Sequence, residues 1–132
     1  MGSRNTLRTL TAMATSDTAC SIYPYFQVPE ANFPKFLELC DRFVTKTRTE
    51  PNCLYYGFTF NGLAVHCREA YTDADALLFH LENVGDILQE ALTIAELTRL
   101  EIHGCESELA KLKEPLKQLD IQYFVLQYGF RN

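Results

Sequence analysis

The dipeptide Asn61-Gly62 restricts the fold of this chain more than any other feature of the sequence. It separates two strand-like runs, 53–60 and 63–71, that are rich in aromatic and β-branched residues. Asn-Gly between such runs is a strong hairpin signal, because a type I′ turn needs a positive φ at both central positions. A two-residue loop sets the register, so we predict that Phe60 pairs with Leu63.

The predicted hairpin has two faces of different character, since side chains alternate along a strand. One face is apolar, but it also carries the carboxylate of Glu69 and the phenol of Tyr71. Its large apolar side chains include Leu54, Tyr56 and Phe58. The opposite face is bulky and mixed, with Tyr55, His66 and Arg68. We therefore expect helices to cover the first face.

Helical and strand patterns flank the hairpin on both sides. Apolar residues at helical spacing predict a helix over 33–49, which Pro51 stops. The other predicted elements are strands at 20–28, 96–104 and 122–130, a helix from Thr72 to the interruption at Gly85, and helices at 86–93 and 107–114. Pro24 cannot donate a ladder hydrogen bond, so the first strand should have a bulge or a free edge there.

The predicted order of the first six elements is β-α-β-β-α-β. This order indicates an α+β, ferredoxin-like fold, an antiparallel sheet with helices on one face, followed by an extra C-terminal helix and strand. No helix remains to cover the hairpin face with Tyr55, His66 and Arg68. We expect a homodimer in which two sheets meet face to face, and the last strand is a candidate for pairing across the interface.

A chain of 132 residues suits one domain, which we assign to 20–132. The first 19 residues are rich in Thr and Ser, and we interpret them as a flexible leader or tag. Three origins are considered: an artificial leader with Met13 as a natural start, the remnant of an organelle transit peptide, or a myristoylation signal formed by Met1-Gly2 and Thr6.

Composition excludes several classes of partner. The net charge of −5 argues against binding to nucleic acid or to an anionic membrane, and no apolar run reaches the ~20 residues of a membrane span. Five cysteines without a C-x-x-C motif indicate neither a disulfide framework nor a zinc site, and the histidines and acids show no metal-ligand spacing. We therefore expect a cytoplasmic protein, although the leader leaves organelle targeting open.

Two motifs carry a resemblance to a known family. Residues 47–56 read T-R-x-E-P-x-C-L-x-Y, and the segment that starts at Glu69 reads E-x-Y-x-D, followed by His-Leu at 80–81. Together they resemble the antibiotic biosynthesis monooxygenase superfamily of dimeric α/β-barrel proteins, over roughly residues 20–104. The superfamily includes cofactor-free oxygenases of phenolic polyketides, quinol oxygenases, haem-degrading enzymes, isomerases of small signalling sugars, and members without an established activity.

The resemblance implies a ligand in an apolar cavity between the sheet and the helices of each subunit. Mapped onto this chain, it implies catalytic roles for Glu69, Tyr71 and His80 and no cofactor. The candidate substrate-binding residues are Leu54, Tyr56, Phe58 and Leu77. The haem-degrading branch has a Trp at the position of His80, and this chain contains no Trp, so haem degradation is not expected.

These residues suit proton transfer in a dry pocket. Apolar surroundings disfavour the ionised form of a carboxyl group unless the group is paired, and a neighbouring imidazole can be that partner. Such a base could deprotonate a phenol or quinol, which then reacts with oxygen, or an enolisable compound, which then isomerises. Two alternatives remain: Glu69 serves only to satisfy structural hydrogen bonds, or the protein is a non-catalytic dimer that binds a small apolar ligand or responds to stress.

Overall fold

The predicted hairpin is present, with a corrected register. In the computed structural model, which describes residues 15–132, strand β2 (Cys53–Asn61) pairs with strand β3 (Ala64–Tyr71). Phe60 pairs with Val65 and not, as predicted, with Leu63. Gly62 has a φ of 60°, and no non-glycine residue among those described has a positive φ. The loop is therefore Gly62-Leu63 with glycine at the first central position, as in a type II′ turn.

A shift of two residues leaves every side chain on its predicted face, because the side-chain period of a strand is two. A β-bulge changes this at the start of β2, where the register moves between Cys53 and Tyr55. Leu54 lies at this bulge and is 38% exposed, so its predicted place on the covered face is wrong. A bulge inserts one unpaired residue and redirects its side chain, which a simple alternation rule does not anticipate.

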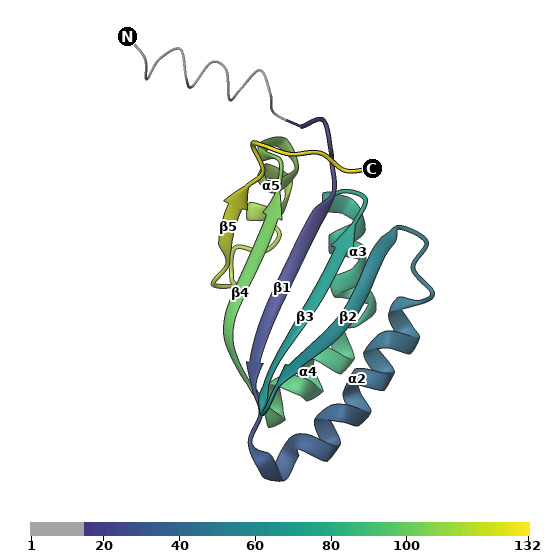
Figure 1. The fold of residues 1–132 in the computed structure, drawn as a ribbon, viewed down its shortest axis with the longest axis vertical. Helices are drawn as coiled ribbons and strands as arrows, with labels where there is room; N and C mark the ends of the chain where they lie inside the picture. The colour runs from purple at the N-terminus through teal and green to yellow at the C-terminus, as the bar shows by residue number, and fades with distance from the viewer. Residues whose placement is uncertain (1–14) are drawn as a thin grey trace.

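The sheet has five strands in the order β2-β3-β1-β4-β5 (Figure 1). Strand β1 (Cys20–Gln27) pairs antiparallel with β3 on one side and with β4 (Glu96–Gly104) on the other. The register of β1 against β4 shifts between Tyr25 and Phe26, which confirms the irregularity predicted beside Pro24. The last strand, β5 (Gln122–Val125), ends five residues earlier than predicted and pairs in parallel with β4 of its own chain.

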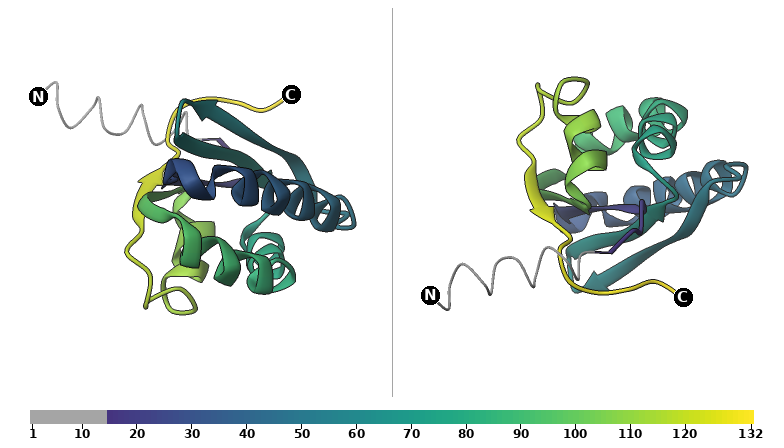
Figure 2. Two further views of the ribbon diagram at one scale, coloured as in Figure 1. Left: turned by 90° about the horizontal axis from the view of Figure 1, so that it is seen from below. Right: turned by 90° about the horizontal axis from the view of Figure 1, so that it is seen from above.

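The helices lie together on one side of the sheet (Figure 2). They are α2 (Phe33–Thr47), α3 (Ala74–Asn83), α4 (Gly85–Ile94) and α5 (Glu106–Lys113), with a single 3-10 turn η1 (Glu30–Asn32) before α2. Helix α3 starts immediately after β3 because the Asp73 side chain accepts a hydrogen bond from the Ala76 amide at 2.8 Å. The chain thus has the predicted α+β, ferredoxin-like fold with an extra C-terminal helix and strand.

The buried side chains form two clusters between the sheet and the helices. One cluster joins β1, β3, β4, α3 and α5, and includes Ile22, Tyr71, Leu77, Ile102 and Leu109. The other joins β1, β3, α2 and α4, and includes Phe26, Phe36, Leu39, Val65 and Ala91. Glu69 and His80 are buried polar residues within this helix-covered layer, at 3% and 2% exposure, so the layer is not uniformly apolar.

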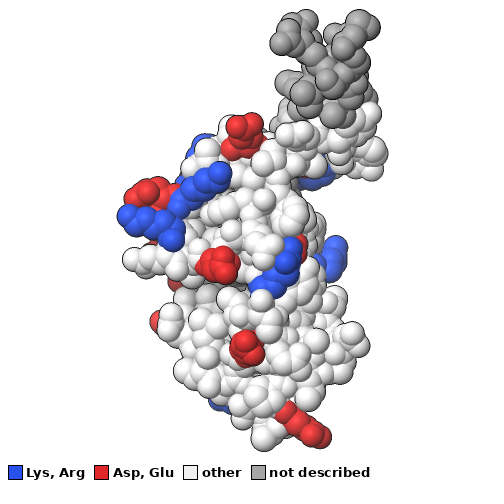
Figure 3. Space-filling model, turned by 90° about the vertical axis from the view of Figure 1, so that its left-hand side faces the viewer, with Lys and Arg blue, Asp and Glu red and all other residues white. Residues whose placement is uncertain are grey.

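The sheet face opposite the helices is open, and we call it the open face. The C-terminal segment after β5 crosses on this side, and Arg131 Nε donates to Asp17 Oδ1 at 2.9 Å (Figure 2). On the side of the molecule shown in Figure 3, Lys and Arg side chains lie among Asp and Glu and do not form a continuous basic patch. Among residues 15–132, no helix is both long enough and apolar enough to cross a membrane.

Candidate active site

The three predicted catalytic residues meet where β3 faces α3. Glu69 and Tyr71 point toward the helices because they are two residues apart on one strand. The Tyr71 hydroxyl donates to Glu69 Oε1 at 2.5 Å, and His80 Nε2 lies 3.1 Å from the same oxygen. The side chains of His80 and Glu69 are 3% and 5% exposed. The geometry therefore joins an acid, a phenol and an imidazole inside the protein.

A fourth member of the cluster, Glu50, was not predicted. Its carboxylate lies 2.9 and 3.2 Å from His80 Nδ1, and Asn83 Nδ2 donates to its Oε2 at 2.8 Å. Glu50 belongs to the Glu-Pro-Asn joint that ends α2, which the sequence explained only as a chain reversal. The acid in that motif was a sign of a site residue, but the sequence does not reveal its partner, because His80 lies 30 residues further along the chain.

The surroundings of His80 determine its charge. Burial lowers the pKa of His80, but the hydrogen bonds and charges of Glu69 and Glu50 together outweigh burial and raise that pKa above its ordinary value of 6.5. Burial and the adjacent Glu69 also raise the pKa of Tyr71, so its hydroxyl keeps its proton and remains a donor. The protonated form of His80, held between Glu69 and Glu50, is therefore favoured relative to that of a free imidazole.

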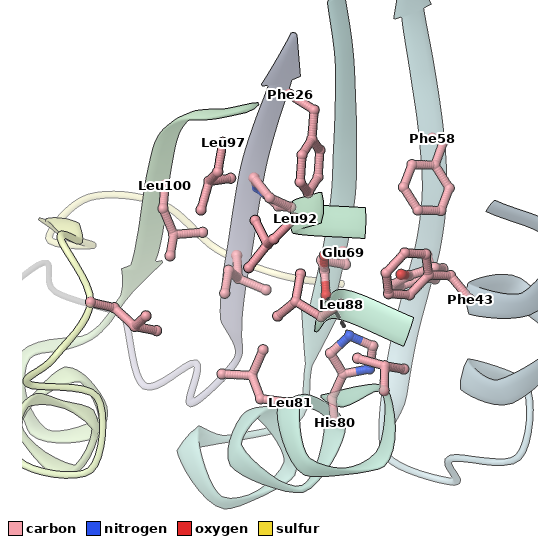
Figure 4. A pocket seen from close by; sticks show the side chains of 15 residues that line it. Phe26, Phe43, Phe58, Glu69, His80, Leu81, Leu88, Leu92, Leu97 and Leu100 are labelled. Carbon is pink, nitrogen blue, oxygen red and sulfur yellow. Dashed lines mark ion pairs between the residues drawn. The ribbon is translucent and has the colours of Figure 1, made fainter. Parts of the chain in front are cut away.

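An apolar cavity of about 90 Å³ opens from Glu69 and His80. In Figure 4, leucine side chains extend to one side of these two residues, and Phe43 and Phe58 lie on the other. The remaining lining residues are Ile22, Pro24, Phe26, Tyr56, Leu81, Val84, Leu88, Leu92, Leu97, Leu100 and Leu119. The acid–base pair thus forms a polar end of an otherwise apolar space.

The predicted binding residues divide into two groups. Tyr56 and Phe58 line the cavity, as the resemblance implied. Leu54 lies at the surface because of the β2 bulge, and Leu77 is fully buried in the cluster between α3 and α5, so neither lines the cavity. The leucines of α4, and Leu119 between α5 and β5, were missed, because their apolar pattern is the same as that of ordinary core residues.

The residues predicted at the dimer interface lie together on the open face. The Arg68 guanidinium lies 4.5 Å from the centre of the Tyr55 ring, and His66 stacks on Tyr23 with ring centres 5.7 Å apart. His103 continues this row, 4.8 Å from Phe124 of β5. Among residues 15–132, no group of three or more His, Cys, Asp or Glu side chains is arranged to hold a metal ion.

Comparison with known structures defines the class of protein. An antibiotic biosynthesis monooxygenase is 19% identical, with a TM-score of 0.56 over 63% of this chain and 92% of that one. Rv0793 from Mycobacterium tuberculosis is 20% identical, with a TM-score of 0.57 over 64% of this chain and 91% of that one. The fold is therefore that of the antibiotic biosynthesis monooxygenase superfamily.

A more similar structure narrows this class. MupZ from Pseudomonas fluorescens is 45% identical, with a TM-score of 0.83, and the match covers 86% of this chain and 94% of that one. The chain belongs to the same family as MupZ, and it shares its fold with the antibiotic biosynthesis monooxygenase described above. No protein-family model matches the sequence, and a search of curated proteins found no match.

Proposed function

We propose that the chain is an enzyme of the cofactor-independent monooxygenase kind, which deprotonates a small phenol- or quinol-type compound in its apolar cavity. The observation that carries the proposal is the contact of 3.1 Å between Glu69 and His80 at the end of that cavity. Both side chains line the cavity, and both are otherwise withdrawn from water. Buried ionisable pairs in a pocket are typical of groups that transfer protons.

The residues take separate roles in this scheme. The Glu69 carboxylate accepts the proton of the substrate hydroxyl, and the Tyr71 hydroxyl holds Glu69 in place. The His80 imidazolium offsets the negative charge that forms on the substrate. A well-placed base accelerates such a step by on the order of 10²–10⁴-fold. The resulting anion is electron-rich and reacts with oxygen itself, so the protein supplies the proton transfer and a dry environment.

The size of the cavity restricts the substrate. Its volume of about 90 Å³ is below the ~300–1,000 Å³ of most small-molecule sites, so a compound larger than one ring requires side chains to move. Leu92 of α4 and Leu119 line the cavity and are 42% and 47% exposed, so they lie where it meets the surface. Movement of these two leucines is the simplest way to admit a ring with an alkyl substituent.

A second candidate activity is isomerisation of a small enolisable compound. It is favoured by the adjacent carboxylate and imidazolium, since an isomerase needs a base to remove a proton and an acid to return it. This reaction consumes no oxygen, which separates it from the first candidate. A non-catalytic dimer that binds an apolar ligand needs the cavity but not the buried acid–base pair.

The test is turnover of a panel of phenols, naphthoquinols and alkyl-substituted quinols, with oxygen consumption recorded by an electrode. We expect consumption with the wild type and with His66→Asn, and a loss of about 10²-fold in Glu69→Gln. His66→Asn is the matched control because His66 lies on the open face. Deuterium incorporation from D2O without oxygen consumption would indicate an isomerase, and a thermal shift without turnover would indicate a binding protein.

We also propose that the open face pairs with a second copy of the chain. Tyr55 and Phe124 are large aromatic residues on this face, exposed at 39% and 44%. The helices all lie on the other side of the sheet, so nothing in residues 15–132 apart from the C-terminal segment crosses this face (Figure 2). Exposed aromatic surface of this kind marks an interface.

A further inference from the structure

Glu50 lies at the boundary between the site and a different part of the surface. It does not line the apolar cavity. Instead it lines a polar hollow of about 270 Å³ between α2 and β2, whose other lining residues are Val44, Thr47, Arg48, Cys53, Tyr55 and Tyr56. With a hydroxyl, a guanidinium and a carboxylate in its lining, this hollow can hold water, unlike the leucine-lined cavity.

His80 connects these two spaces through its two ring nitrogens. Nδ1 faces Glu50, which lines the polar hollow, and Nε2 faces Glu69, which lines the apolar cavity. Other groups around the ring are Tyr71 and Tyr56 of the sheet, with ring centres 4.8 and 5.4 Å away, and Asn83 of α3, which donates to Glu50. Within residues 15–132, the polar contacts of the His80 ring nitrogens are with these two carboxylates.

We propose that Glu50 is a positioning residue and a proton exit: it orients His80 and exchanges protons between His80 and water in the polar hollow. The charge of His80 can then change while the apolar cavity is still occupied. The inference deepens the proposed function and rests on it for its purpose, because the charge of His80 is what offsets the negative charge that forms on the substrate.

The proton balance is simple. A His80 ring that carries a proton on both nitrogens passes the Nδ1 proton to Glu50 and becomes a neutral imidazole with its proton on Nε2. Glu50, now a carboxylic acid, releases that proton to water in the polar hollow. The same two steps in reverse return the proton to Nδ1 and restore the starting state. No electron transfer or co-reactant is involved.

The test observes His80 directly in the full-length protein without any ligand. Nitrogen-15 NMR of the imidazole reports its protonation state, and the exchange of its ring protons with water reports the relay. We expect Glu50→Gln to lower the protonation constant of His80 by on the order of tenfold. We also expect it to slow ring-proton exchange by about tenfold. Glu108→Gln is the matched control, since Glu108 is equally buried, at 6%, but contacts Ala74 and Lys111.

Glu50→Asp guards against a variant that fails to fold, because it retains the charge and shortens the side chain by one methylene. Slower exchange of the His80 ring protons in the Glu50 variants than in the wild type supports the proposal. An unchanged exchange rate in a folded Glu50→Gln or Glu50→Asp variant overturns it, even if the protonation constant of His80 changes. The measurement uses no substrate. The role of Glu50 in proton exchange can therefore be disproved while quinol turnover is found, or supported while no quinol is turned over. The two proposals are thus judged separately.

Discussion

His80 and His66 lie on opposite sides of the same sheet, and burial lowers the pKa of both. For His80, direct contacts with Glu69 and Glu50 outweigh burial, and the pKa is raised. For His66, the charges of Glu101 and Glu69 act without a direct contact and Arg68 opposes them, so the pKa is lowered. The comparison teaches that a carboxylate contact at both ring nitrogens, and not the mere presence of acids nearby, decides in which direction the pKa of a buried histidine moves.

The strongest way to break this comparison is to remove each ring. We expect His80→Leu to lower the free energy of unfolding by about 3–5 kcal/mol at pH 7, because it leaves the buried Glu50 and Glu69 without their common partner. His66→Leu should change it by less than about 0.5 kcal/mol. Urea denaturation measures both, and equal losses in the two variants would contradict the account.

A smaller effect is expected from the hydroxyl that holds Glu69. Tyr71→Phe removes a buried hydrogen bond to a carboxylate, which costs about 1.5–3 kcal/mol. Tyr25→Phe is its counterpart on the open face, where Tyr25 packs on the His66 ring, and it should be nearly neutral. The same denaturation assay compares them, and a neutral Tyr71→Phe would show that the hydroxyl does not support the site.

The pH dependence of stability sharpens the comparison through its sign. Because the folded pKa of His80 is raised, its stabilising contribution is fully present below pH 6.5 and is lost as pH rises through that folded pKa. The folded pKa of His66 is lowered, so that residue costs stability as pH falls from 6.5 toward it. Unfolding free energies from pH 5.5 to 9 for wild type, His80→Asn and His66→Asn should give difference curves of opposite slope.

The smallest effect on the monomer is expected on the open face. Arg68→Glu should change the free energy of unfolding by less than about 0.5 kcal/mol, yet it should dissociate the proposed dimer by placing a new negative charge in the interface. Sedimentation equilibrium measures association. Lys35→Glu is the control, since Lys35 lies on α2 with a side chain that is 53% exposed, and it should leave association unchanged.

Much of the site could be predicted because its chemistry is local. Glu69 and Tyr71 share a face through strand alternation alone, and Asp73 places the start of α3, which brings His80 back over the sheet. Tyr56 and Phe58 line the cavity for the same reason, despite a register that differs by two residues. Leu54 could not be placed, since nothing in the alternation pattern reveals a bulge.

By itself the sequence determined the order of the elements, the two faces of the hairpin and the end of α2 before Pro51, because these depend on interactions over a few residues. Only the tertiary structure decided that Glu50 meets His80, that leucines of α4 and Leu119 line the cavity, and that β5 pairs in parallel with β4. Those contacts join residues distant in the chain, and packing selects them among many arrangements that local patterns allow equally.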